Sequence, residues 1–190
     1  MRAPRTLPAR LHPGMTEAPG PEILLPEAGV AEAVSALADR LAPRLSGEAV
    51  CVCLLTGGLW FAADLTRALA ARGRPLAFDA LWLTSYGDRQ MTSGAVSVLA
   101  GLRRPVTGRQ VLILDDVLES GLSLEAARRL VLAAGASEVL TAVFALKPPR
   151  TPGRRPPDDF AWEAPDRFLV GYGMDSAGAY RALPWIGALP

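Results

Sequence analysis

Histidine and cysteine are scarce in this chain of 190 residues. The only histidine, His12, stands near the N-terminus, so a histidine-based metal site or catalytic triad is excluded from the body of the chain. The two cysteines, Cys51 and Cys53, lie two residues apart in an apolar segment, where they share one face of a strand and make a poor disulfide pair. We therefore expect two buried, reduced thiols, as is typical of a cytoplasmic protein.

The chain also lacks a large charge of one sign and a long apolar run. Its net charge is +1, with acidic and basic residues interspersed, which argues against a nucleic-acid-binding arm. No apolar run approaches the roughly twenty residues that span a bilayer, and the N-terminus has arginines but no apolar segment of a secretory signal. Hydrophobic residues make up 50% of the chain, enough for a sizeable core. We expect small-molecule partners, with neither nucleic acid nor membrane among them.

The apolar pattern divides the chain into an N-terminal arm and one folded domain. Residues 1–21 hold many prolines and arginines without periodicity, so we expect a disordered arm followed by a domain over residues 22–190. Apolar runs predict strands, and helical spacing predicts helices. We expect strands at 23–26, 49–55, 76–83, 95–99, 111–114, 139–146 and 168–172, helices at 28–45, 59–72, 124–135 and 177–180, and loops at 84–94 and 148–159. This alternation predicts a three-layer α/β fold.

The stretch from Val111 to Leu124 combines a buried strand, two carboxylates, a small polar turn and the start of a helix. The backbone N–H groups of a helix N-terminus, together with serine hydroxyls, can bind a phosphate. Asp115 and Asp116 would lie beside that turn, where they could bind sugar hydroxyls or a hard cation. The alternative is an ordinary strand-to-helix turn in which Asp and Ser serve as caps, and spacing alone leaves both interpretations open.

The same stretch resembles the phosphoribosyl pyrophosphate (PRPP) motif of type I phosphoribosyltransferases: an aliphatic strand, two acidic residues, two aliphatic residues, an acidic residue, Ser, Gly, any residue and Ser. Further segments match the hypoxanthine-guanine branch of that family in the same order. They are Leu55–Gly58, Ser85–Gly87, Lys147–Pro148, Pro165–Asp175 and Tyr180–Gly187. The resemblance covers roughly residues 22–189. It implies the three-layer parallel-sheet fold of these enzymes, with a flexible hood loop and a small C-terminal base-binding segment.

The resemblance implies purine salvage, in which the 5-phosphoribosyl group of PRPP passes to hypoxanthine or guanine and yields IMP or GMP plus pyrophosphate. Glu119 and Lys147 are implied as catalytic, the first accepting the proton at purine N7 and the second donating to O6. PRPP and its phosphates are assigned to Asp115, Asp116, Glu119, Ser120, Gly121, Leu122, Ser123, Thr56, Gly57 and Arg181. The purine is assigned to Lys147, Phe168, Leu169 and Asp175, the hood loop to Ser85 and Tyr86, and Mg²⁺ to Asp175, Asp115 and Asp116. A homo-dimer or homo-tetramer is also implied.

Some residues depart from the family pattern. Glu119 stands where Asp is usual, Thr56 where Lys is common, and Asp115 where Glu is usual. Arg150 precedes the usual arginine position by one residue, and Thr151 occupies that position. These departures leave open a catalytically weakened regulatory paralogue that binds nucleotide or PRPP, and also a xanthine- or adenine-directed enzyme. Adenine is disfavoured, because it lacks the O6 to which Lys147 would donate.

Overall fold

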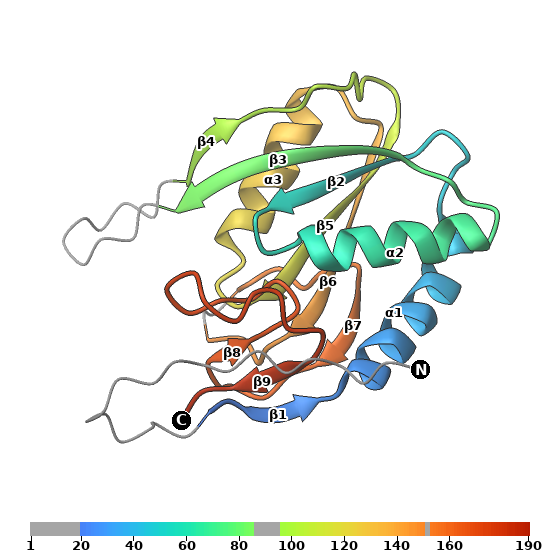
Figure 1. Ribbon diagram of the computed structural model, residues 1–190. Coiled ribbons are helices and arrows are strands. Elements are labelled where there is room, and N and C mark those ends of the chain that lie inside the picture. Colours follow the sequence, from blue (N-terminus) through green and yellow to red (C-terminus); the bar gives the residue numbers. More distant parts are fainter. Residues whose placement is uncertain (1–19, 86–95, 151–152) are drawn as a thin grey trace.

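The computed structural model describes residues 20–85, 96–150 and 153–190, in which helices cover both faces of a central sheet (Figure 1). Six strands form that sheet in the order β4-β3-β2-β5-β6-β7, and β1, β9 and β8 form a small antiparallel sheet. The central strands run parallel except β4, which is antiparallel to β3. The elements are β1 (Glu22–Leu25), α1 (Glu27–Leu41), η1 (Ala42–Arg44), β2 (Val50–Leu55), α2 (Leu59–Ala71), β3 (Ala77–Ser85), β4 (Val96–Ala100), β5 (Gln110–Leu118), α3 (Leu122–Ala133), β6 (Glu138–Leu146), β7 (Asp159–Glu163), β8 (Leu169–Val170) and β9 (Ile186–Ala188).

Two apolar clusters fill the space on either side of the central sheet. Successive residues of a strand point to opposite faces, so Cys51 and Cys53 pack with α1 and α2 while Val50 and Val52 pack with α3. Both cysteines are buried and unpaired, as the sequence predicts. The parallel pairing of β2 with β5 therefore places the carboxyl ends of both strands at one edge, between the two helical layers. No helix among the described residues is long and apolar enough to cross a membrane.

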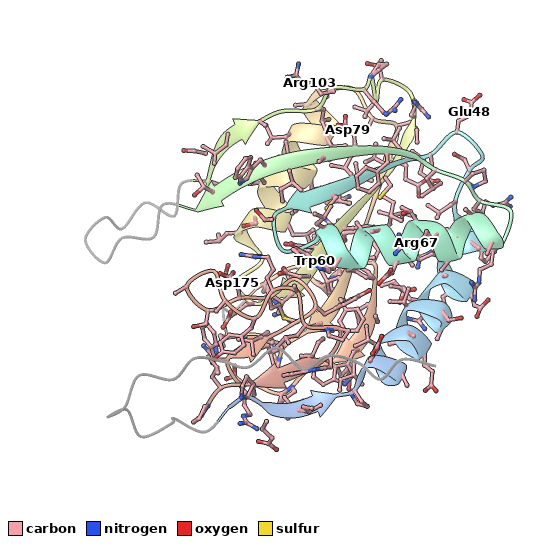
Figure 2. The ribbon with its side chains drawn as sticks, in the orientation of Figure 1. Glu48, Trp60, Arg67, Asp79, Arg103 and Asp175 are labelled. Carbon is pink, nitrogen blue, oxygen red and sulfur yellow. The ribbon has the colours of Figure 1, made fainter. Side chains whose placement is uncertain are left out.

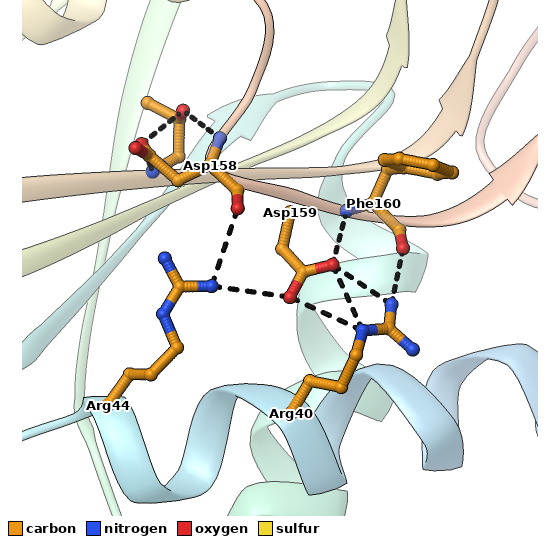
Figure 3. A network of polar contacts seen from close by, with 6 residues as sticks. Arg40, Arg44, Asp158, Asp159 and Phe160 are labelled. Atoms are coloured by element: carbon orange, nitrogen blue, oxygen red, sulfur yellow. Dashed lines mark hydrogen bonds and ion pairs between the residues drawn. The ribbon is translucent and has the colours of Figure 1, made fainter.

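Buried carboxylates fix the connections around the sheet. Asp79 on β3 is 8% exposed and accepts hydrogen bonds from the backbone N–H groups of Arg103 and Arg104, each at 2.8 Å, which holds the turn before β5 (Figure 2). Asp159 at the start of β7 accepts hydrogen bonds from Arg40 on α1 and Arg44 on η1 (Figure 3). Helix α1 is thereby tied to the last strand of the central sheet.

The structure corrects several predicted boundaries. Strand β5 continues past residue 114 to Leu118, because its acidic end still pairs with β6 at Asp115–Val143 and Val117–Ala145. The two aspartates therefore lie inside a strand rather than after it. Helix α3 begins at Leu122, earlier than the predicted residue 124, since Leu122 faces outward and does not belong to the apolar stripe.

The C-terminal third holds the remaining differences. Strands β7 and β9 were not predicted. The first residue of β7, Asp159, was expected to end a loop, and no element was expected over the rest of β7 or over β9. The predicted helical turn at 177–180 is wrong: a bridge between Ser176 and Ala179 closes a tight turn there. The predicted arm at 1–21 lies almost entirely outside the described residues.

Candidate active site

A pocket of about 340 Å³ opens at the carboxyl ends of β2 and β5. Ligands of open parallel sheets bind at this edge, so the location agrees with the general rule. Five separate segments of the chain contribute to its wall: the end of β2 with the turn after it, β3 through Leu83, the end of β5, the first turn of α3 and the loop before β9. The predicted site residues that line it are Thr56, Gly57, Asp115, Asp116, Ser123, Asp175 and Arg181.

The two aspartates in the pocket wall are buried side by side, which disfavours the charged form of Asp115 most. Burial raises the pKa of the Asp115 carboxyl well above its ordinary value, and the neighbouring charge of Asp116 raises it further. Burial also raises the pKa of Asp116, but less, because it is a hydrogen-bond partner of Asp115 and the positive charge of Arg181 opposes the shift. The pair therefore favours a ligand that supplies hydrogen-bond donors or positive charge, as ribose hydroxyls or a cation would.

The turn after β2 approaches this pair closely. It begins with a cis peptide bond between Leu55 and Thr56, and Leu59 N donates to Thr56 O at 3.2 Å. A Cβ atom added at Gly57 would collide with the Asp116 carboxylate. Glycine is thus required at residue 57 for the turn to lie against the end of β5.

Asp175 and Arg181 hold the opposite wall together. Arg181 donates through Nη1 to Gly173 O at 2.6 Å and through Nη2 to the Asp175 carboxylate, and Gly178 N donates to Asp175 Oδ2 at 2.7 Å. Figure 2 shows Asp175 on the C-terminal loop, near the start of α2 that Trp60 marks. Asp175 is therefore already engaged within its own loop and orients Arg181 at the pocket.

Glu119 and Lys147 lie together, but neither lines the central pocket, and Lys147 lines a separate cavity of about 300 Å³. Lys147 is the only lysine among the 20 lysine and arginine residues of the sequence, and it is 5% exposed. Its Nζ lies 3.4 Å from Glu119 Oε1, and Arg150 Nη1 lies 3.3 Å from the same oxygen. A solvated surface lysine is the ordinary expectation, and the structure contradicts it here. The Glu119 side chain itself is 45% exposed, so a ligand can reach it.

The turn between β5 and α3 has the geometry of an anion-binding helix start. Gly121 is the N-cap residue with φ of 82°, a left-handed conformation that glycine adopts without strain. The first helical hydrogen bond runs from Glu125 N to Gly121 O, so the preceding N–H groups of the turn have no helical acceptor. The Ser120 hydroxyl accepts from Leu122 N at 3.4 Å. Ser120, Gly121 and Leu122 line a second cavity of about 270 Å³ behind this turn.

The remaining predicted residues fall elsewhere. Phe168 is 56% exposed immediately before β8, and Leu169, the first residue of β8, is buried and pairs with Ala188 of β9. Neither belongs to the residues that line the central pocket within the described chain. Ser85 is the last residue of β3, and Tyr86 lies outside the described residues.

Sequence reasoning missed Arg154, whose guanidinium bonds to the backbone of both Glu119 and Lys147. Nothing in the spacing separates Arg154 from the adjacent Arg155, because both stand in a loop rich in proline and arginine. The fold alone distinguishes them.

Comparisons with known proteins agree with this geometry. The sequence model of the family described as "Phosphoribosyl transferase domain" matches residues 30–177. The chain is 31% identical to the hypoxanthine phosphoribosyltransferase of Salmonella typhimurium over 169 residues, 87% of this chain and 93% of that protein. It is 35% identical to the hypoxanthine-guanine phosphoribosyltransferase of Bacillus subtilis over 136 residues, 72% of this chain and 74% of that protein. A crystal structure of a hypoxanthine phosphoribosyltransferase from Staphylococcus aureus superposes with a TM-score of 0.82 at 29% identity, covering 89% of this chain and 91% of the other.

Proposed function

The chain belongs to the phosphoribosyltransferase family, in its hypoxanthine-guanine branch, and from this premise we propose that it is a purine-salvage enzyme. It transfers the 5-phosphoribosyl group of PRPP to hypoxanthine or guanine and yields IMP or GMP plus pyrophosphate. The observation that carries this proposal is the single pocket in which the Asp115–Asp116 pair, the turn at Thr56 and Gly57, and Arg181 meet. These groups match the sugar, pyrophosphate and phosphate parts of one substrate.

PRPP is held along the wall of this pocket. Its 5-phosphate binds the N–H groups of residues 120–123, where the start of α3 favours negative charge. Its ribose hydroxyls donate to Asp115 and Asp116, because burial raises the pKa of both carboxyl groups and hydrogen-bond donors stabilise their charged forms. Its pyrophosphate lies between the turn at Thr56 and Arg181, which stabilise the charge that develops on the leaving group.

The purine lies beside Lys147, with Phe168 stacked on its face and the backbone of Leu169 at its 2-position. Lys147 Nζ donates to O6, and Glu119 accepts the proton at N7 while N9 attacks C1 of the ribose. The 3.4 Å between Lys147 Nζ and Glu119 Oε1 supports this arrangement, since O6 and N7 are adjacent on a purine. A positioned proton acceptor contributes about 10²–10⁴-fold to such a rate.

Magnesium fits the pocket only together with the substrate. Among the described residues, no three His, Cys, Asp or Glu side chains are grouped closely enough to hold a metal ion. Mg²⁺ is commonly held by one or two carboxylates plus substrate phosphates, and Asp115, Asp116 and Asp175 offer such carboxylates at the pocket wall. When bound with PRPP, Mg²⁺ would neutralise charge on the pyrophosphate oxygens.

We further propose a cytoplasmic location and a homo-dimeric or homo-tetrameric state. Buried, unpaired Cys51 and Cys53 suit a reducing compartment. Exposed Phe78 and Trp82 on β3 supply apolar surface that a second copy would cover.

Turnover assays test the proposed activity. Purified protein is incubated with PRPP, Mg²⁺ and one base at a time, and pyrophosphate and nucleotide are measured. We expect turnover with hypoxanthine or guanine and none with adenine, which lacks O6. Binding of GMP without turnover of any base would instead indicate a regulatory paralogue.

Replacement of Lys147 tests the base site. We expect K147A to lower kcat/KM for the purine by about 10²-fold, because a charge-assisted contact to O6 is lost. Arg129→Ala, which removes an exposed cation from α3, serves as the control and should retain wild-type kinetics. Full turnover by K147A would overturn the assignment of this lysine to the purine.

A further inference from the structure

Arg154 reaches from the loop between β6 and β7 back to the ends of two strands. Its Nη1 donates to Leu118 O and to Glu119 O, each at 3.0 Å, and its Nη2 donates to Lys147 O at 2.9 Å. Leu118 O also accepts from Lys147 N at 3.3 Å. One half-buried guanidinium thus joins the point where β5 becomes the phosphate turn to the point where β6 ends at Lys147.

The stem of the same side chain packs against the phosphate turn. Arg154 Cγ lies 3.1 Å from the position that a Cβ atom would take at Gly121, and Gly121 has the left-handed φ that begins α3. The arginine therefore occupies the space next to residue 121 and lines the cavity of about 270 Å³ together with Ser120, Gly121 and Leu122. A change at residue 154 removes a support from behind the turn.

The choice of partners indicates a geometric role rather than an ion pair. All three described acceptors of Arg154 are backbone carbonyls, and its Nε is buried without an acceptor among the described residues. Leaving a buried donor unpaired disfavours the folded state, so this placement is not optimal for stability. A planar guanidinium with donors in a fixed fork can hold several carbonyls at set distances, which a flexible ammonium does less well.

Glu119 is consequently fixed by two different arginines. Arg150 contacts its carboxylate, at 3.3 Å, while Arg154 holds its main chain. Because the carboxylate is 45% exposed, its direction depends on how firmly the main chain is held. The lysine that faces it is held through its carbonyl by the same guanidinium.

We propose that Arg154 is a positioning residue. It holds the phosphate turn at Gly121 in a fixed position relative to the base-contacting pair Glu119 and Lys147. This inference rests on the proposed function, since it assigns those two sites to PRPP and to the purine. Arg154 acts on both sites through the backbone carbonyls that it holds. Its loss displaces contacts to both, so the binding of PRPP and of the base deteriorates together.

Steady-state kinetics test the consequence. We expect R154A to raise KM for PRPP and KM for the purine, each by about tenfold, because small displacements of positioned groups weaken every contact they make. R154K should show a smaller rise in both KM values, and R129A, which changes an exposed arginine of α3, should keep the wild-type values. A variant that merely contains less folded protein shows a lower apparent kcat with unchanged KM values. Unchanged KM values in R154A, or a rise for one substrate alone, would overturn the proposal.

Hydrogen exchange separates this inference from the proposed activity, because it needs no substrate. We expect amides in peptides covering 118–124 and 143–148 to exchange faster in R154A than in the wild type and in R129A, while peptides from α1 stay unchanged. Wild-type protein without turnover would refute the activity, and the exchange result would still decide whether Arg154 links the two segments. Unchanged exchange in both peptides would refute the link.

Discussion

At the scale of single residues, the Asp115–Asp116 pair carries the clearest conflict between stability and function. Two adjacent carboxyl groups at the end of β5 face one pocket, and burial raises the pKa of both. A group whose pKa is higher in the folded chain than in the unfolded chain contributes stability at low pH and loses it as pH rises through the folded value. At neutral pH this pair therefore lowers the stability of the ligand-free protein.

Replacing Asp115 with asparagine removes this loss of stability. We expect D115N to be more stable than the wild type by about 1 kcal/mol at pH 8, and to lose affinity for PRPP, as is common when a functional site is neutralised. The stability difference should vanish below about pH 4, where the carboxyl is protonated in both folded and unfolded chains. Urea unfolding at several pH values provides the measurement.

Asp39 supplies a control of opposite sign. A hydrogen bond from Arg72 lowers the pKa of the exposed Asp39 carboxyl, so its contribution is present at neutral pH and is lost on acidification. D39N should therefore lose a little stability at pH 8, whereas D115N gains it. Equal stability of D115N and wild type at pH 8 would contradict the account of the aspartate pair.

At the scale of secondary-structure elements, the sequence predicted the strands and helices that bury long apolar runs. The β2–α2 and β6 segments are clear because each carries its own periodicity. Strand β7, with Asp159 and Glu163 at its two ends, and the three-residue β9 have no such pattern. Strands β7 and β9 form because they pair with segments distant in the sequence, so no local pattern predicts them.

The difference between local patterns and long-range contacts also explains which site residues could be predicted from the sequence and which could not. Asp115, Asp116 and Ser123 belong to one contiguous motif, and the fold needs only to turn them toward one pocket. Arg154 depends on a loop that returns across the ends of two strands. Its role follows from backbone geometry and could not be predicted from the amino-acid pattern.

Strand β7 is held to the molecule by Asp159, and this tie yields a prediction at the element scale. The Asp159 side chain is 13% exposed and accepts from Arg40 Nη2 at 2.9 Å and Arg44 Nη1 at 3.3 Å (Figure 3). We expect D159A to lower the free energy of unfolding by about 1–2 kcal/mol, because two partly exposed arginines lose a shared, largely buried partner. Urea denaturation measures this loss.

Glu22 provides the matched comparison for that variant. Its pair with Arg167 also bridges distant segments, but the Glu22 side chain is 64% exposed. E22A should change the free energy of unfolding by less than about 1 kcal/mol, as exposed ion pairs do. If both variants had the same small effect, the tie between α1 and β7 would be of no consequence for stability.

At the scale of the whole molecule, the pocket lies between the central sheet and the loop that joins two strands of the small sheet. Asp115, Asp116 and Thr56 come from the central sheet, whereas Asp175 and Arg181 come from the loop that leads from β8 to β9. The two parts already meet at Gly57 and Gly173, where the carbonyl oxygen of Gly57 leaves no room for a Cβ atom on Gly173. A substrate that spans the pocket adds further bonds between them.

PRPP with magnesium should therefore stabilise both sheets together. At a free concentration of a hundred times its dissociation constant, a ligand that binds only the folded chain adds about 2.7 kcal/mol of stability, which raises the melting temperature by several degrees. We expect amide exchange to slow both in 55–58 and in 171–188. Arg181→Met should reduce the shift, because this arginine joins the loop to the pocket, while Arg167→Met, which breaks only the exposed contact with Glu22, should preserve it. Protection confined to β5 and α3 would mean that PRPP engages the central sheet alone, and the C-terminal loop would then have no part in holding the pyrophosphate.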